Sequence, residues 1–340
     1  MKTSFVQMMR FLVLFLWLPA AFAATKDSGG ELRLYMMPAY PVAMNWDSPK
    51  ALTDSSMRAL AMNKNHMIGH VSVEVNCPTL RGTDSQIVSG AVPVSAGDNA
   101  KLLFVEKVGL RILEASWPGK LETREEVLKA VEARKTDSNT LAVATFLVSE
   151  STCKRLLDYY KEYSETAKPM FYGNSPRPRR KEGSGCSAFG VSFLEVAGLM
   201  TEEFRRDWIV ARRVPFSLMG GYGPETISVF ELLKKPEAQK WAAPEDPHMY
   251  LETFEPAFMY QWVRSLAGNP EQLRALGGEI DPDLAKTMPL TPAIRIDRRS
   301  VRTPTEPVFK PGPFLEYIND YAVIRSDKKL APNGSFELRP

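Results

Sequence analysis

The sequence is poor in the residues that build metal clusters and disulfide scaffolds. Only three histidines and three cysteines occur among its 340 residues. It has no zinc-type CxxC or HExxH pattern, and one set, His66, His70 and Cys77, is left as a metal alternative. Two of its members fall on different elements, so we do not favour it. We expect neither a metal nor an organic cofactor.

The chain also lacks an excess of one charge and, after its start, long apolar runs. Its 43 basic and 40 acidic residues leave a net charge of +3. A nucleic-acid partner would need a strongly basic face, so none is expected. No segment after the start is long and apolar enough to cross a bilayer. With 44% hydrophobic residues and no internal repeat, the composition is that of a globular protein.

Residues 1–23 have the pattern of a secretory signal peptide. Lys2 and Arg10 flank a short charged region, and FLVLFLWLPAA leads to Ala-Phe-Ala at 21–23. We expect cleavage there, with an uncleaved anchor as the alternative. The mature protein would then be periplasmic or secreted and carry a net charge of +1, since cleavage removes two basic residues and no acid.

Export places the three cysteines in an oxidising compartment, where an odd number leaves one unpaired. Cys77 and Cys153 are the candidate pair, which leaves Cys186 free. Three separate buried thiols are an equally good interpretation, because spacing does not give connectivity.

Periodicity predicts alternating strands and helices through the first two thirds of the chain. Ser48 and Pro49 mark one helix start, and Val71, Val73 and Val75 share one face of a strand. We expect strands at 30–38, 68–76, 85–94, 101–115 and 139–149, and helices at 48–62, 124–134 and 150–165.

We divide the chain into a signal peptide at 1–23, a main domain at 24–235 and a C-terminal extension at 236–340. The extension is rich in proline and has few strong periodicities, although 249–268 and 313–326 look ordered. We expect it to wrap on the main domain.

The stretch GSGCSAFGVSFLEVAGL, residues 183–199, places Cys186 at the start of a helix that is apolar on nearly all sides. A helix N-terminus lowers the pKa of a thiol, and its free N–H groups can hold an oxyanion. Gly183 and Gly185 would let a substrate carbonyl approach the backbone. A small buried hydrophobic residue is the alternative interpretation of this cysteine.

A cysteine nucleophile needs a base, and His70 is the best placed of the three histidines. It opens an alternating strand, whereas His66 lies in a loop and His248 in the proline-rich tail. Glu74 shares a face with His70 but lies about 13 Å along the strand, so we expect a solvated or loop-pairing acid there.

The order of these pieces resembles the circularly permuted papain-like superfamily of permuted NlpC-type hydrolases, lecithin:retinol-acyltransferase-like proteins and the periplasmic domain of lipoprotein intramolecular transacylases. The matching pieces are IGHVSVEV around His70, LVSESTCKRLLDYYKEY and GCSAFGVSFLEVAGL around Cys186, within about residues 65–200. Permuted members often have Asn before the cysteine, where this chain has Gly185.

The resemblance implies an α+β fold in which an antiparallel sheet packs on the cysteine helix, with Cys186 as nucleophile and His70 as base. It places a third residue, which orients the histidine, on the neighbouring strand, where Gln86 and Ser89 are the candidates. The implied activity is hydrolysis or acyl transfer at an amide or ester of a cell-envelope substrate, a peptidoglycan peptide or a lipid acyl group. Amide hydrolysis ranks first, and a non-catalytic envelope scaffold is the alternative.

Two further features fit either a ligand or plain structure. The basic run Arg177, Arg179, Arg180 and Lys181 could attract an anionic substrate, but a solvated surface loop is favoured. The tryptophans could line a pocket, although packing in the core is their commoner use. The tryptophans in question are Trp46, Trp117, Trp208, Trp241 and Trp262.

Overall fold

The computed structural model describes residues 29–62, 69–80, 85–95, 97–138, 140–166, 171–174, 177–220 and 226–310. The expected signal peptide, His66 and the segment 313–326 lie outside the described residues. Within these ranges, no helix has both the length and the apolar character that a membrane span requires.

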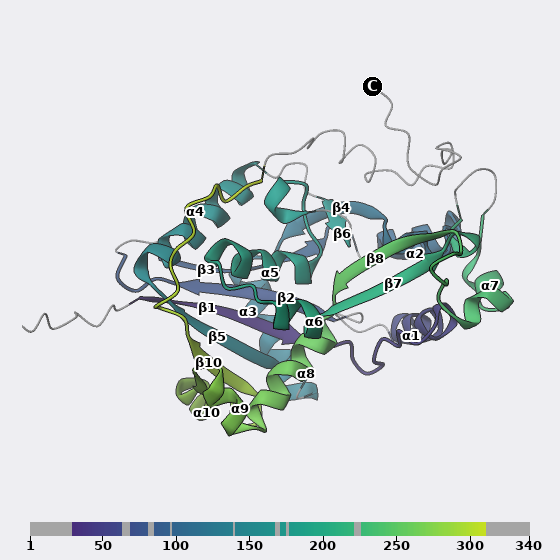
Figure 1. The fold of residues 1–340 in the computed structure, drawn as a ribbon. Coiled ribbons are helices and arrows are strands. Elements are labelled where there is room, and N and C mark those ends of the chain that lie inside the picture. The colour runs from purple at the N-terminus through teal and green to yellow at the C-terminus, as the bar shows by residue number, and fades with distance from the viewer. Residues whose placement is uncertain are drawn as a thin grey trace, which may run out of the picture.

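An eight-stranded, mostly antiparallel sheet forms the centre of the α+β fold (Figure 1). The strand order is β6-β4-β3-β2-β1-β5-β10-β9, and β10 runs parallel to β5. The strands are β1 (Gly30–Met37), β2 (His70–Asn76), β3 (Gln86–Pro93), β4 (Ser116–Leu121), β5 (Ala142–Val148), β6 (Phe171–Gly173), β9 (Gly278–Ile280) and β10 (Ala293–Asp297).

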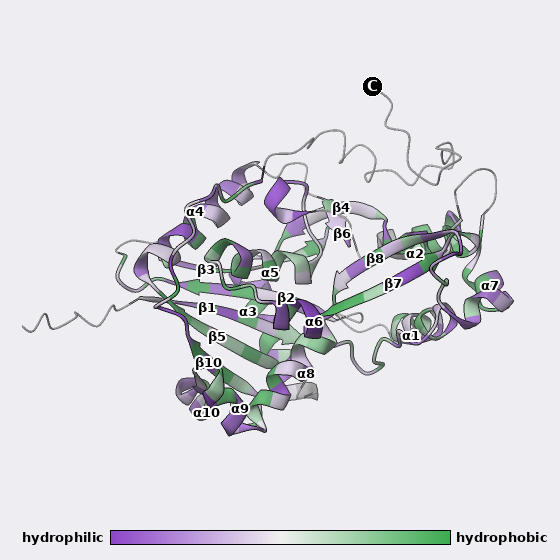
Figure 2. Ribbon diagram, viewed as in Figure 1, coloured by the Kyte–Doolittle hydropathy of each residue, from purple (hydrophilic) through white to green (hydrophobic). Residues whose placement is uncertain are grey.

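Helices cover both faces of this sheet. Leu34, Val71 and Val73 belong to the large core under α5, and Tyr35 and Val143 belong to a second core that includes Val127 of α3. Figure 2 shows hydrophobic residues concentrated in α5 and the central strands. The α-helices of the described residues are α1 (Pro49–Ala61), α2 (Gly97–Ala100), α3 (Arg124–Ala133), α4 (Glu150–Thr166), α5 (Cys186–Ala197), α6 (Glu202–Trp208), α7 (Val229–Leu232), α8 (Pro256–Ala267), α9 (Pro270–Ala275) and α10 (Pro282–Thr287).

A separate two-stranded ribbon, β7 (Ile209–Pro215) and β8 (His248–Phe254), extends beside the sheet (Figure 1). Its inner residues form a third core with α1 and α7, which includes Leu52, Val214 and Leu232. Trp46 joins this core and stacks on Trp241 with ring centroids 6.4 Å apart. The molecule therefore has a sheet part and a ribbon part, each with its own core.

The described part of the expected C-terminal extension, 236–310, differs from the expectation. It supplies β8 to the ribbon and β9 and β10 to the main sheet, where Ile294 and Ile296 of β10 are buried. The segment is an integral part of both sheets. These strands are short and separated by prolines, so their alternation is too brief to detect in the sequence.

Two local predictions are also wrong. Residues 101–115, expected as a strand, form short helical turns at η2 (Lys101–Val105) and η3 (Leu110–Leu113). Lys107 and Gly109 have φ values of 53° and 54°, which interrupt an extended run. The strand at this point is β4, which follows immediately and was not predicted. Residues 209–215, for which the sequence analysis predicts no strand, form β7.

The candidate cysteine pair is bonded in the structure. Cys77 and Cys153 form a disulfide that joins the end of β2 to α4, and Cys186 is the free cysteine. Cys77 is therefore unavailable as a metal ligand, which removes the metal alternative that depended on it.

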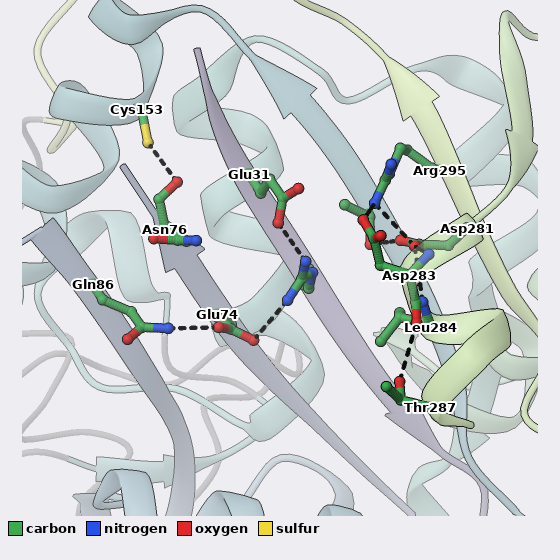
Figure 3. Close-up of polar contacts among 12 residues, drawn as sticks. Glu31, Glu74, Asn76, Gln86, Cys153, Asp281, Asp283, Leu284, Thr287 and Arg295 are labelled. Carbon is green, nitrogen blue, oxygen red and sulfur yellow. Dashed lines mark hydrogen bonds and ion pairs between the residues drawn. The ribbon is translucent and has the colours of Figure 1, made fainter. Parts of the chain in front are cut away.

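Glu74 is neither the solvated acid nor the loop-pairing acid that the sequence predicts. It is 7% exposed and contacts the hydroxyl of Tyr35 and the guanidinium of Arg33 on β1. It also accepts a hydrogen bond of 2.8 Å from Gln86 Nε2 on β3 (Figure 3). The residues that share its strand face are thus part of a buried polar layer.

Candidate active site

Cys186 is the first residue of α5 and is 7% exposed. Gly185 precedes it in an extended conformation, with no side chain that could cap the helix. The N–H groups of the first helical turn have no acceptor within the helix. The thiol therefore lies where a helix N-terminus favours negative charge.

The glycines before Cys186 are needed for packing, and Gly185 also lines the cavity onto which Cys186 opens. Gly183 has a φ of +102°, and a Cβ there would lie 2.0 Å from the carbonyl oxygen of Phe171. A Cβ on Gly185 would lie 2.7 Å from the oxygen of Gly173. Both residues let the loop close against β6, and this contact fixes the position of Cys186.

His70 is the first residue of β2 and is 1% exposed. Its Nε2 lies 2.7 Å from Oε2 of Glu122, which follows β4 and is 5% exposed. His70 also hydrogen-bonds the side chain of Cys186. Because Nε2 is taken by Glu122, Nδ1 is the ring nitrogen left for the thiol. The structure thus brings together the two residues that the sequence singled out.

Strand β3 lies between His70 and Glu122. The two side chains can meet across β3 because Gly90, which lies between them, has no side chain. A Cβ on Gly90 would lie 2.1 Å from Oε2 of Glu122 and 3.2 Å from Nε2 of His70. Backbone pairing holds the acid in place, since the N–H of Glu122 donates to the carbonyl of Gly90 at 2.8 Å and Ser89 Oγ donates to the carbonyl of Glu122 at 2.9 Å. Glu122 therefore reaches His70 across a strand that lacks a side chain there.

Glu122 occupies the orienting position for which Gln86 and Ser89 were the candidates. Gln86 binds Glu74, and Ser89 supports the backbone of Glu122. The sequence did contain one signal for this arrangement. A glycine inside a strand often marks the close approach of another group, and Gly90 is such a glycine.

The thiol and imidazole stabilise each other's charged forms. Burial opposes charge on Cys186, but the hydrogen bond and charge of His70, with hydrogen bonds from Tyr172 and the backbone of Val71, lower the pKa of the thiol. Burial likewise opposes charge on His70, yet Cys186 and Glu122 together raise the pKa of the imidazole to about 10. Each group therefore shifts the other toward the thiolate–imidazolium form.

Tyr172 is a further member of the site, which sequence reasoning missed. It lies on β6, opposite Trp117 of β4, and the two rings pack with centroids 5.8 Å apart. Burial and the neighbouring Cys186 raise the pKa of Tyr172, so its hydroxyl keeps its proton and can donate to the sulfur. No local pattern in the sequence marks this residue.

Cys186 opens onto a cavity of about 990 Å³ between the sheet part and the ribbon part. Its wall is mostly apolar and draws on α1, η3 and β8. Two of the five tryptophans, Trp46 and Trp117, line it, whereas Trp208 and Trp262 pack in the main core. The other apolar lining residues include Leu52, Met57, Leu60, Leu110, Leu113 and Leu251.

The basic run before Cys186 has a structural use that neither sequence interpretation foresaw. Arg179 is 6% exposed and donates to the carbonyls of Val308 and Pro307 at 3.0 and 3.1 Å. Lys181 binds Glu162 at 2.6 Å and lies 4.4 Å from the ring centroid of Phe309. These residues hold the segment ending at Lys310 against α4 and α5.

The chain matches no protein-family model, no curated protein and no solved structure. Functional inference therefore rests on the geometry of the site.

Proposed function

We propose that this protein is an exported cysteine-dependent hydrolase or acyltransferase that acts on an amide or ester of a cell-envelope substrate. Cys186 is the nucleophile, His70 the general base and acid, and Glu122 the residue that orients the imidazole. One observation carries the proposal. The thiol contacts a buried histidine that is held by a buried carboxylate, and the same thiol faces a large cavity.

The chemistry follows from these positions. The Cys186 thiolate attacks the substrate carbonyl carbon, and the resulting oxyanion is held by N–H groups at the start of α5 and by the Tyr172 hydroxyl. Collapse expels the amine or alcohol, which takes its proton from His70, and leaves a thioester on Cys186. Water or an acceptor alcohol or amine then gives its proton to His70 and attacks the thioester. Collapse expels the Cys186 thiolate and the acyl product, and His70 keeps its proton, which restores the starting pair.

The lining of the cavity bears on the choice of substrate. Peptidoglycan peptides are polar, whereas leucine, methionine and tryptophan side chains make up much of the wall, together with charged residues that include Arg177, Arg180 and Glu252. An apolar acyl group buries well against such a wall. The apolar part of the cavity thus favours a lipid acyl group over a peptidoglycan peptide, two substrates that the sequence analysis left open.

The fold and location belong to the same proposal. The strand of His70 precedes the helix of Cys186 along the chain, and that helix packs on a mostly antiparallel sheet. Both features are expected of a circularly permuted papain-like domain. The Cys77–Cys153 disulfide supports an oxidising compartment, in agreement with an N-terminal signal peptide.

The test is trapping of the acyl-enzyme. We expect p-nitrophenyl octanoate to add one octanoyl group to Cys186, detected by intact-protein mass spectrometry and peptide mapping. Cys186→Ala should lose this adduct, and His70→Ala should slow its formation by about a thousand-fold. A Cys186 that stays unmodified, in a folded protein that also resists iodoacetamide, would overturn the proposal and leave the scaffold alternative.

A further inference from the structure

A second buried acid, Glu255, lies in the wall of the same cavity and plays no part in the chemistry above. It is 4% exposed and stands between β8 and α8. Two of the charged residues that line the cavity are buried, Glu255 and Arg179. Arg179 has protein partners in Glu195, Glu306 and the carbonyls already named. Glu255 takes part in none of the ion pairs in the described part of the chain.

The protein satisfies only part of this carboxylate. Oε2 accepts a hydrogen bond of 3.0 Å from Trp46 Nε1, and Oε1 accepts one of 3.2 Å from the N–H of Ala257. Two carboxylate oxygens offer about four acceptor positions, so about half of this capacity remains. A buried carboxylate that lacks a cation is costly, and burial accordingly raises the pKa of Glu255 to about 7.

The position of Glu255 relates it to the catalytic end of the cavity. Pro256 follows it, and a Cβ on Gly69 would lie 3.0 Å from the Pro256 side chain. Gly69 directly precedes His70, and both Gly69 and Pro256 line the cavity with Cys186. A substrate that enters the apolar space thus meets Glu255, a buried acid without an ion-pair partner among the described residues. This acid lies near the strand that carries His70.

We propose that Glu255 is a specificity-determining residue that binds a protonated primary amine carried by the substrate or acceptor. An ammonium group would fill the remaining acceptor positions and supply the missing positive charge. The surrounding apolar wall would hold the alkyl chain of the same molecule. This inference rests on the proposed function for its place in a reaction, but the binding event itself does not.

The first experiment measures binding without turnover. Calorimetry on the Cys186→Ala protein compares hexylamine with 1-hexanol at mildly alkaline pH, where Glu255 is charged and the amine still carries its proton. We expect hexylamine to bind about ten-fold more tightly, and Glu255→Gln to remove that difference. Equal affinities, or a difference that survives Glu255→Gln, would overturn the proposal.

The second experiment measures selectivity during turnover. The substrates are p-nitrophenyl esters of ω-amino acids of increasing chain length, each paired with its ω-acetamido analogue. For at least one length, we expect kcat/KM for the amino ester to exceed that of its analogue by about ten-fold in the wild type. Glu255→Gln should bring this ratio close to one, whereas Glu255→Asp should keep the preference and move it to a longer chain.

A matched control separates recognition from structure. Glu203 also accepts an indole N–H, from Trp262 Nε1 at 3.3 Å, but it does not line this cavity. Glu203→Gln should leave the ratio of the two ester types unchanged. If Glu255→Gln lowers turnover of both ester types equally, Glu255 only caps α8 and holds Trp46, and the proposal fails. If the wild type hydrolyses no ester, the proposed function fails, and the calorimetry alone decides the role of Glu255.

Discussion

Two groups of polar residues in this protein share one feature, a buried carboxylate beside a basic side chain, and differ in what surrounds them. The thiol site consists of Cys186, His70, Glu122 and Tyr172. The Asp281 cluster consists of Asp281, Asp283, Arg295 and Thr145, part of which is visible in Figure 3. Each group contains a fully or almost fully buried carboxylate beside a basic side chain, brought together from distant parts of the sequence.

The difference lies in how completely the protein itself satisfies each group. Asp281 accepts hydrogen bonds from Thr145 Oγ1 at 2.8 Å, from Arg295 at 3.0 Å and from the backbone N–H groups of Asp283 and Leu284. It does not line the cavity on which Cys186 opens. Cys186 has partners on one side and cavity on the other. Burial and pairing therefore occur in structural and reactive groups alike, and access to a cavity distinguishes them.

The largest effect that tests this comparison is expected from the Asp281 cluster. Asp281→Ala leaves a partly buried guanidinium without its buried partner and removes the cap of α10, so we expect a loss of about 3 kcal/mol in unfolding free energy. Urea denaturation measures it. Asp283→Ala removes the exposed partner of the same Arg295 and should cost less than about 1 kcal/mol.

The same two variants sharpen the contrast with the thiol site. In both variants, when folded, iodoacetamide should alkylate Cys186 at the wild-type rate. A slower reaction at Cys186 in folded Asp281→Ala would show that the two groups are coupled through the sheet, and the distinction drawn above would be lost.

The sequence predicts the parts of the thiol site that carry a local signature. Cys186 begins an apolar helix after a run of glycines, and His70 begins a strand with a regular alternation. Both signatures lie within a few neighbouring residues. The expected helix start at Ser48 is also confirmed, since its Oγ accepts the N–H of Ala51.

Glu122 and Tyr172 could not be found in the same way. Each reaches the site through strand pairing, Glu122 after β4 and Tyr172 on β6, and pairing partners are not written in local periodicity. The C-terminal strands were missed for a related reason. β10 pairs with β5, which lies far from it in the sequence. The five residues of β10 are too few to show a period.

A smaller effect than the loss of Asp281 is expected when Glu122 is replaced in the thiol site. Glu122→Gln keeps the size of the side chain but removes the charge that raises the pKa of His70. Less imidazolium then remains to stabilise the thiolate, so alkylation of Cys186 at neutral pH should slow by about 30-fold. The wild-type rate should reach its plateau at a lower pH than the rate of the variant, because the charge of His70 lowers the pKa of the thiol.

Gly90→Ala tests the same contact without a change in charge. The added Cβ would lie 2.1 Å from Oε2 of Glu122, so the carboxylate has to move away from His70. We expect the pH profile of alkylation to shift in the same direction as in Glu122→Gln. A wild-type profile in Gly90→Ala would contradict the role assigned to the position of Glu122.

The smallest effect is expected from Tyr172→Phe, which keeps the ring against Trp117 and removes only the hydroxyl. Loss of one hydrogen bond to a charged sulfur and to the oxyanion should slow acylation of Cys186 by about ten-fold and raise the pKa of the thiol. The matched control is Tyr163→Phe, since the Tyr163 hydroxyl is buried in the main core with no hydrogen-bond partner among the described residues. Stopped-flow acylation of both variants compares a hydroxyl at the cavity with one in a closed core. Equal rates in the two would mean that Tyr172 supports the site only through packing, and that the chemistry needs no more than Cys186, His70 and Glu122.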